Sequence, residues 1–119
     1  MHVASLELCK ELYELSGRMW HEEIIYSWHK DDGDYVIEDF WSGSICPAYD
    51  LGYLLRKLPV ITELKKWDDE YVAQCYWGNH DSHSSGIPLI KNFKSKANTP
   101  EDAACKLAIE LFKQGILTK

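Results

Sequence analysis

The sequence lacks any uninterrupted apolar run long enough to cross a membrane. A membrane-spanning helix needs roughly 20 consecutive apolar residues, and no run in this chain comes near that length. Residues 1–10 also lack the apolar core of a secretory signal and include the charged Glu7. We therefore expect a cytoplasmic protein with no membrane segment.

The spacing of the cysteines fits neither a disulfide framework nor a zinc knuckle. The four thiols, which include no CxxC pair, are separated by 37, 29 and 30 residues; they are Cys9, Cys46, Cys75 and Cys105. Zinc sites and small disulfide scaffolds use closer pairs. Together with the expected compartment, this spacing predicts four reduced thiols.

Cys46 has the most reactive setting of the four thiols in the sequence. It directly precedes Pro47, which we expect to begin a helix, and the dipole at a helix start favours the thiolate. A catalytic nucleophile would also need a base, and no local Cys/His pattern supplies one. We therefore interpret Cys46 as a small, half-buried loop residue.

Motifs of the common enzyme classes are also missing. The chain contains no phosphate-binding P-loop, no dinucleotide-binding glycine fingerprint, no Gly-x-Ser-x-Gly elbow and no His-Glu-x-x-His zinc motif. These absences favour a protein that is not an enzyme and that uses no cofactor.

One predicted loop carries residue types that can bind zinc. His80 and His83 are three residues apart, with Asp81 between them. The same residue types are common in solvated loops because they tolerate turns. We expect a solvated loop without a metal, and a metal-dependent enzyme is kept as an alternative function.

The chain has fewer basic than acidic residues. It contains thirteen basic and nineteen acidic residues, for a net charge of −6. Such a chain repels the phosphate backbone, so non-specific binding to nucleic acid is not expected. The acidity favours solubility. The alternative is an acidic face that mimics nucleic acid or docks on a basic partner.

Periodicity along the 119 residues predicts one domain, residues 1–119, of the α+β class. Helices are expected over residues 5–16, 47–58 and 99–114, and strands over residues 22–29, 35–41, 61–67, 71–77 and, more weakly, 89–94. The order α-β-β-α-β-β-(β)-α favours an antiparallel sheet of four to five strands, with the three helices packed mainly on one face. Lysines and Pro88 place the last strand at a sheet edge.

Aromatic residues are the main surplus: five Trp, seven Tyr and three Phe. Rings of this size usually fill the core, and core packing is our expectation for each tryptophan. If helices cover only one face of the sheet, however, some rings must lie on the other face. Those rings would form a platform for a partner or an interface between copies of the chain.

Three stretches of the chain resemble a group of small bacteriophage and prophage proteins of unassigned function. They are residues 10–17 (KELYELSG), 47–59 (PAYDLGYLLRKLP) and 99–117 (TPEDAACKLAIELFKQGIL). The resemblance implies expression in the cytoplasm of a bacterial host. It implies no catalytic residues, because the matched stretches are helices and helix caps.

Two predicted loops, residues 41–46 and 78–86, are the candidate binding site. Each follows a strand that ends near a tryptophan and is rich in small hydrogen-bonding residues, a composition typical of binding loops. The candidate residues are Trp41, Ser42, Ser44, Trp77, Asn79, His80, Asp81 and His83.

Our leading hypothesis from the sequence is a non-enzymatic phage accessory protein. It would bind a host protein and thereby inhibit an anti-phage defence system. The alternative is a homo-oligomer that sequesters a small nucleotide signal, which would require Arg or Lys beside aromatic rings. The basic residues available for that role are Arg18, Arg56, Lys91, Lys94 and Lys96.

Overall fold

The fold contains both helices and antiparallel sheets, so the predicted α+β class is confirmed. The computed structural model describes residues 2–16, 20, 24, 26–39, 44–59, 62–79 and 89–117; residues 77–79 and 89–91 are described by their backbone alone. Within this part of the chain there are three helices and six strands. In chain order they are α1 (Leu6–Leu15), β1 (Tyr26–Asp31), β2 (Asp34–Asp39), β3 (Cys46–Pro47), α2 (Leu51–Lys57), β4 (Thr62–Trp67), β5 (Glu70–Asn79), β6 (Leu89–Ala97) and α3 (Pro100–Lys113).

The strands form two three-stranded sheets where the sequence predicted one. The first sheet has the order β2-β1-β3 and the second has the order β4-β5-β6, with every neighbouring pair antiparallel. Pairing inside a hairpin is fixed by its turn, whereas pairing between distant hairpins leaves no local signal in a sequence. The predicted edge position of β6 is confirmed by the order of the second sheet.

The two predicted hairpins have the expected short turns. Asp32 and Gly33 have φ angles of 48° and 88° and connect β1 to β2. Two successive positive φ angles match the right-handed twist of the strands, which is why Asp-Gly is favoured there. In the second hairpin Asp68, with a φ of 54°, follows Trp67 and reverses the chain into β5.

Helix starts follow capping chemistry. Ser5 and Thr99 are the N-caps of α1 and α3, so both helices begin where they were expected. The predicted start of the second helix at residue 47 is wrong, since α2 begins at Leu51. Asp50 is its N-cap, and its carboxylate accepts the Tyr53 N–H at 2.7 Å. That bond satisfies one of the free amides of the first turn, a role that Pro47 cannot fill.

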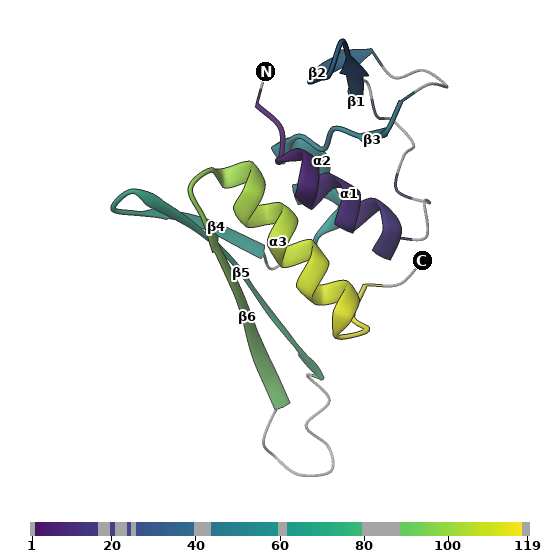
Figure 1. Cartoon of the computed structure of the whole chain (residues 1–119). Helices are drawn as coiled ribbons and strands as arrows, with labels where there is room; N and C mark the ends of the chain where they lie inside the picture. The colour runs from purple at the N-terminus through teal and green to yellow at the C-terminus, as the bar shows by residue number, and fades with distance from the viewer. Residues whose placement is uncertain are drawn as a thin grey trace.

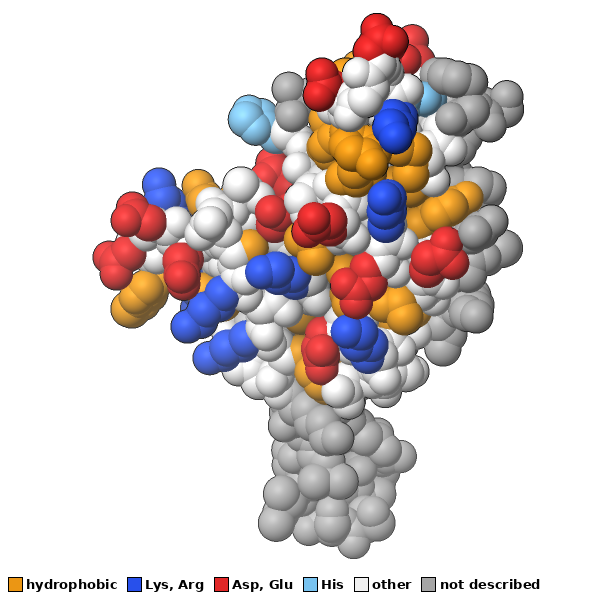
Figure 2. Space-filling view, in the orientation of Figure 1, with side chains coloured by type: hydrophobic (Ala, Val, Ile, Leu, Met, Phe, Trp, Pro, Cys, Tyr) orange, Lys and Arg blue, Asp and Glu red, His pale blue; other side chains and the backbone are white. Residues whose placement is uncertain are grey.

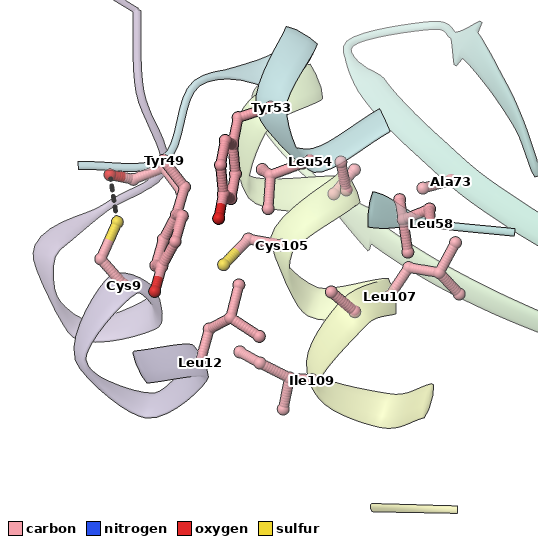
Figure 3. Close-up of a cluster of buried hydrophobic side chains, with 14 of the residues drawn as sticks. Cys9, Leu12, Tyr49, Tyr53, Leu54, Leu58, Ala73, Cys105, Leu107 and Ile109 are labelled. Atoms are coloured by element: carbon pink, nitrogen blue, oxygen red, sulfur yellow. Dashed lines mark hydrogen bonds between the residues drawn. The ribbon is translucent and has the colours of Figure 1, made fainter. Parts of the chain in front are cut away.

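Helix α3 forms the middle layer of the molecule. It packs against β5 and β6 on one side and against α1 and α2 on the other (Figure 1). Side chains from these elements meet in one buried cluster, including Leu12, Tyr53, Leu54 and Cys105 (Figure 3). Among the described residues, no helix is both long and apolar enough to cross a membrane.

The helices leave one face of the second sheet uncovered. Helix α3 lies along the inner face of β5 and β6, and no described element packs on the opposite face (Figure 1). The prediction that helices cover mainly one face therefore holds for this sheet. Its open face carries the side chains of Lys65 and Trp67 from β4 and of Lys94 and Lys96 from β6.

Candidate binding face on the second sheet

The loop residues predicted to bind a partner fall largely beyond what the structure describes. Trp41, Ser42, His80, Asp81 and His83 all lie outside the described residues. The two strand residues of that set, Trp77 and Asn79, belong to β5 but are described by backbone alone. The remaining residue, Ser44, is half-buried just before β3. The predicted loop site therefore stays a prediction.

The interpretation of Cys46 as a half-buried loop residue is wrong in both position and burial. Cys46 lies in β3, opposite Trp28 of β1, and is only 2% exposed. Burial raises the pKa of its thiol to about 12. A thiol with such a raised pKa is protonated near neutral pH, and because it is also shielded from solvent it does not act as a nucleophile there.

A serine and a histidine on β1 also lie within hydrogen-bonding distance. Ser27 Oγ and His29 Nε2 are 2.7 Å apart, and the same nitrogen lies 3.2 Å from the carbonyl oxygen of Asp39. Ser27 is fully buried and His29 is 3% exposed, so a substrate cannot reach the pair. In the described part of the chain, no three His, Cys, Asp or Glu side chains gather as metal ligands.

Side-chain alternation divides the second sheet into two chemically different faces. The inner face contributes Leu64, Ala73, Cys75, Phe93 and Ala97 to the core under α3. The opposite side chains form what we name the binding face; they are Glu63, Lys65, Trp67, Glu70, Val72, Gln74, Tyr76, Asn92, Lys94 and Lys96. Successive side chains of a strand point to opposite faces, so this division follows directly from the register.

The register sets the rows of side chains that cross the binding face. Val72 of β5 pairs with Lys65 on one side and with Lys96 on the other. Directly opposed residues of antiparallel strands have Cβ atoms about 5 Å apart. Two lysines therefore flank one valine, and Lys94 lies in the next row opposite Gln74.

A hollow of about 250 Å³ lies over these rows at the Trp67 end of the face. We name it the Trp67 hollow; its lining residues are Lys65, Trp67, Glu70, Val72, Gln74, Lys94 and Lys96. Trp67 is 72% exposed and Tyr76, farther along β5, is 41% exposed. Figure 2 shows basic, acidic and hydrophobic side chains side by side at the left of the molecule, over the hairpin of β4 and β5.

A short polar network borders the Trp67 hollow. Gln74 Nε2 donates to Glu63 Oε2 at 2.9 Å, and Lys65 Nζ lies 3.4 Å from the same oxygen. The Gln74 hydrogen bond, followed by Lys65, lowers the pKa of Glu63 below its ordinary value. Glu63 is therefore anionic near neutral pH and partly neutralises Lys65. Lys94 and Lys96 form no ion pair with any described residue.

The sequence contained a signal for this face that we did not use. In β4, Leu64 faces the core while Lys65 and Trp67 share the other side. The expectation of a core position was correct for Trp20, which is 8% exposed, and wrong for Trp67. A tryptophan two residues from a lysine in a strand, out of phase with the apolar positions, indicates an exposed ring.

The chain matches no family model, curated protein or solved structure with which it was compared. The resemblance of residues 47–59 and 99–117 to phage proteins therefore stays a prediction. The binding face has to be interpreted from its own residues.

Proposed function

We propose that the protein is a non-enzymatic binding protein that docks another protein on the binding face of the second sheet. The observation that carries the proposal is the open side of β4, β5 and β6, which combines exposed Trp67 and Tyr76 with flanking lysines. Tryptophan and tyrosine are enriched among the residues that contribute most to protein interfaces.

The size of the face supports a protein as the partner. Glu70 and Tyr76 are six residues apart on β5, so the face extends for about 20 Å along the strand at roughly 3.3 Å per residue. A standard interface buries about 800 Å² on each partner. Three strands at a spacing of about 4.8 Å make the face about 14 Å wide, so its flat area of roughly 290 Å² would form the centre of such an interface.

The described chemistry supports a binding role over catalysis. The four thiols are free and buried, and burial raises the pKa of each. The Ser27–His29 pair is closed to solvent. The binding face itself carries lysines, carboxylates and aromatic rings, which suit recognition.

The phage context comes from the sequence resemblance alone. It supports a partner in the cytoplasm of a bacterial host, and a component of an anti-phage defence system is the partner that we favour. Inhibition would then follow from steric occlusion by the bound chain, a mechanism that requires no catalytic residue.

Capture of a small nucleotide is the second candidate. Lys94 and Lys96, two of the cations this function would need, line the same hollow as Trp67, although β5 separates them from it. The hollow measures about 250 Å³, however, whereas sites for small ligands usually span roughly 300–1,000 Å³. A hollow of this size fits one or two side chains of a protein better than a whole nucleotide.

Site-specific photo-crosslinking in a lysate of the bacterial host tests the proposal. A benzophenone amino acid replaces Tyr76 on the binding face in one variant. In the matched control it replaces Tyr35, which lies on the first sheet and is 49% exposed. We expect one host protein to be crosslinked at position 76 and not at position 35, and the adduct to be lost when Trp67→Ala is added.

Three outcomes would contradict the proposal. Adducts at position 35 alone would place the interface on the first sheet. Adducts that contain only the chain itself would indicate that the face joins copies of the protein. An adduct at position 76 that survives Trp67→Ala at full yield would show that the exposed ring does not anchor the partner.

A further inference from the structure

The Trp67 hollow is a basic site on a chain whose net charge is −6. Three of its seven lining residues are lysines, and the single carboxylate is Glu70. Lys65 is partly neutralised by Glu63, whereas Lys94 and Lys96 form no ion pair with a described residue. Two unneutralised ammonium groups around an apolar floor attract an anion and raise its rate of association.

We infer that the partner presents an extended acidic segment to this hollow, with two carboxylates at Lys94 and Lys96 and an apolar side chain against Val72 and Trp67. The inference rests on the proposed function, because it names the chemistry of the partner at the same face. It makes the binding face the basic half of a charge-complementary interface.

The spacing of the lysines favours an extended segment. Lys94 and Lys96 are two residues apart on β6 and share one face of the sheet. Side chains on one face of a strand recur every two residues, which corresponds to about 6.6 Å. An extended partner has the same repeat, so acidic residues at alternate positions would match both lysines at once.

The centre of the hollow favours an apolar side chain between charges. Val72 lies between Lys65 and Lys96 in one row, and Trp67 forms the wall at the end of β4. Burying a leucine-sized side chain on such a floor is worth about 1.5–3 kcal/mol when burial is complete. Exposed ion pairs contribute only about 0.2–1 kcal/mol each, so the apolar contact supplies affinity and the lysines select the partner.

A nucleic acid fits the same surface less well. Single-strand binding needs a continuous positive groove along the phosphates together with stacked aromatic rings. On the binding face Glu63 and Glu70 interrupt the lysines. Trp67 and Tyr76 lie at opposite ends, about 20 Å apart along the strand direction.

Amide chemical shifts of the isotope-labelled protein measure the inferred interaction. The probe is a short synthetic peptide in which glutamates and one leucine alternate with serines; the control peptide carries lysines in place of the glutamates. We expect the glutamate peptide to shift Lys65, Trp67, Val72, Lys94 and Lys96, and the lysine peptide to leave them unchanged. Raising the salt to about 1 M, where the Debye length is near 3 Å, should weaken the effect.

Charge-removing variants provide the second measurement. The double variant Lys94→Gln/Lys96→Gln should bind the glutamate peptide about two- to thirtyfold more weakly, the range expected for the loss of two exposed ion pairs. Lys30→Gln is the matched control, because Lys30 is exposed on the first sheet, and it should bind as the wild type does. Equal shifts with both peptides, unchanged binding by the double variant, or stronger shifts of the same residues with AMP or oligothymidylate would each overturn the inference.

The crosslinking experiment separates this inference from the function on which it rests. If the adduct at position 76 depends on Trp67 but survives Lys94→Gln/Lys96→Gln, the face docks a protein without acidic recognition and the inference alone fails. If the glutamate peptide binds as expected but no host protein is crosslinked at position 76, the proposed function fails.

Discussion

The backbone N–H of Ser5 donates to the Asp102 carboxylate at 2.7 Å, joining the starts of α1 and α3 across 97 residues of sequence. Ser5 is itself the N-cap of α1. The Asp102 N–H donates to the hydroxyl of Thr99, the N-cap of α3, at 3.1 Å. Asp102 thus links the caps of two helices that pack against each other, through its carboxylate at Ser5 and its backbone N–H at Thr99.

Removal of the Asp102 carboxylate should destabilise the fold. Asp102→Ala leaves the Ser5 N–H without its charged acceptor and removes a negative charge from the positive end of α3. We expect a loss of about 1–3 kcal/mol in the free energy of unfolding, measured by urea denaturation. Glu38→Ala, at an exposed position of β2, is the control and should stay within about 0.5 kcal/mol.

Truncation of Trp20 and of Trp67 should change the stability of the fold by very different amounts. Trp20 is 8% exposed, and its ring contacts the edges of Phe112 and Tyr53, with centroids 5.0 and 6.5 Å away. Trp20→Ala should therefore cost about 3–5 kcal/mol of stability. Trp67→Ala should change stability by less than about 0.5 kcal/mol, because the ring is 72% exposed. A large loss of stability in Trp67→Ala would remove Trp67 from the binding face.

Local chemistry in the sequence was enough to predict most elements of this fold. Caps such as Ser5 and Thr99 and the turn at Asp32-Gly33 act within a few residues, so a sequence records them. The start of α2 was missed because Pro47 and Asp50 are both residue types found at helix starts, and only the capping bond of Asp50 decides which start is used. The division into two sheets depends on contacts between distant strands.

The binding face was only partly predictable for the same reason. Ring exposure on an uncovered sheet face was expected in general, and the only local signal for which ring is the position of Trp67 two residues from Lys65, out of phase with Leu64. Lys94 and Lys96 were recognised as basic residues available for a ligand, but Lys65, which comes from another strand, was not. The register that brings Lys65 and Lys96 to either side of Val72 is a property of the folded sheet.

Two glycines should respond in opposite directions to the same added methyl group. Gly33 has a φ of 88° in the first hairpin turn, a conformation that alanine adopts at a cost, so Gly33→Ala should lose about 1 kcal/mol. Gly52 lies in α2, where a Cβ would meet Asp50 Oδ1 at an ordinary 3.5 Å. Gly52→Ala should gain about 0.5–1 kcal/mol. Thermal unfolding should show a lower melting temperature than the wild type for Gly33→Ala and a higher one for Gly52→Ala.

The thiols should be unreactive in the folded protein. Burial raises the pKa of Cys9 to about 11 and that of Cys46 to about 12, and it also raises those of Cys75 and Cys105. At pH 8 we expect a thiol-specific chromogenic reagent to modify none of them rapidly, and to modify all four after unfolding in urea. Fast modification of one thiol in the native protein would show that its side chain is accessible.

Stability should fall in alkaline solution because of these same thiols. Their folded-state pKa values lie above the unfolded value of 9.0, so the folded chain keeps protons that the unfolded chain releases. The stabilisation is complete below about pH 9 and is lost as the pH rises toward 11–12. We expect the urea midpoint to decrease steadily from pH 8 to pH 10. Cys46→Ala is the informative variant: with one fewer group to ionise, its midpoint should decrease less over the same interval, even if it starts lower. An identical slope in the variant and the wild type would mean that Cys46 does not hold its proton in the fold.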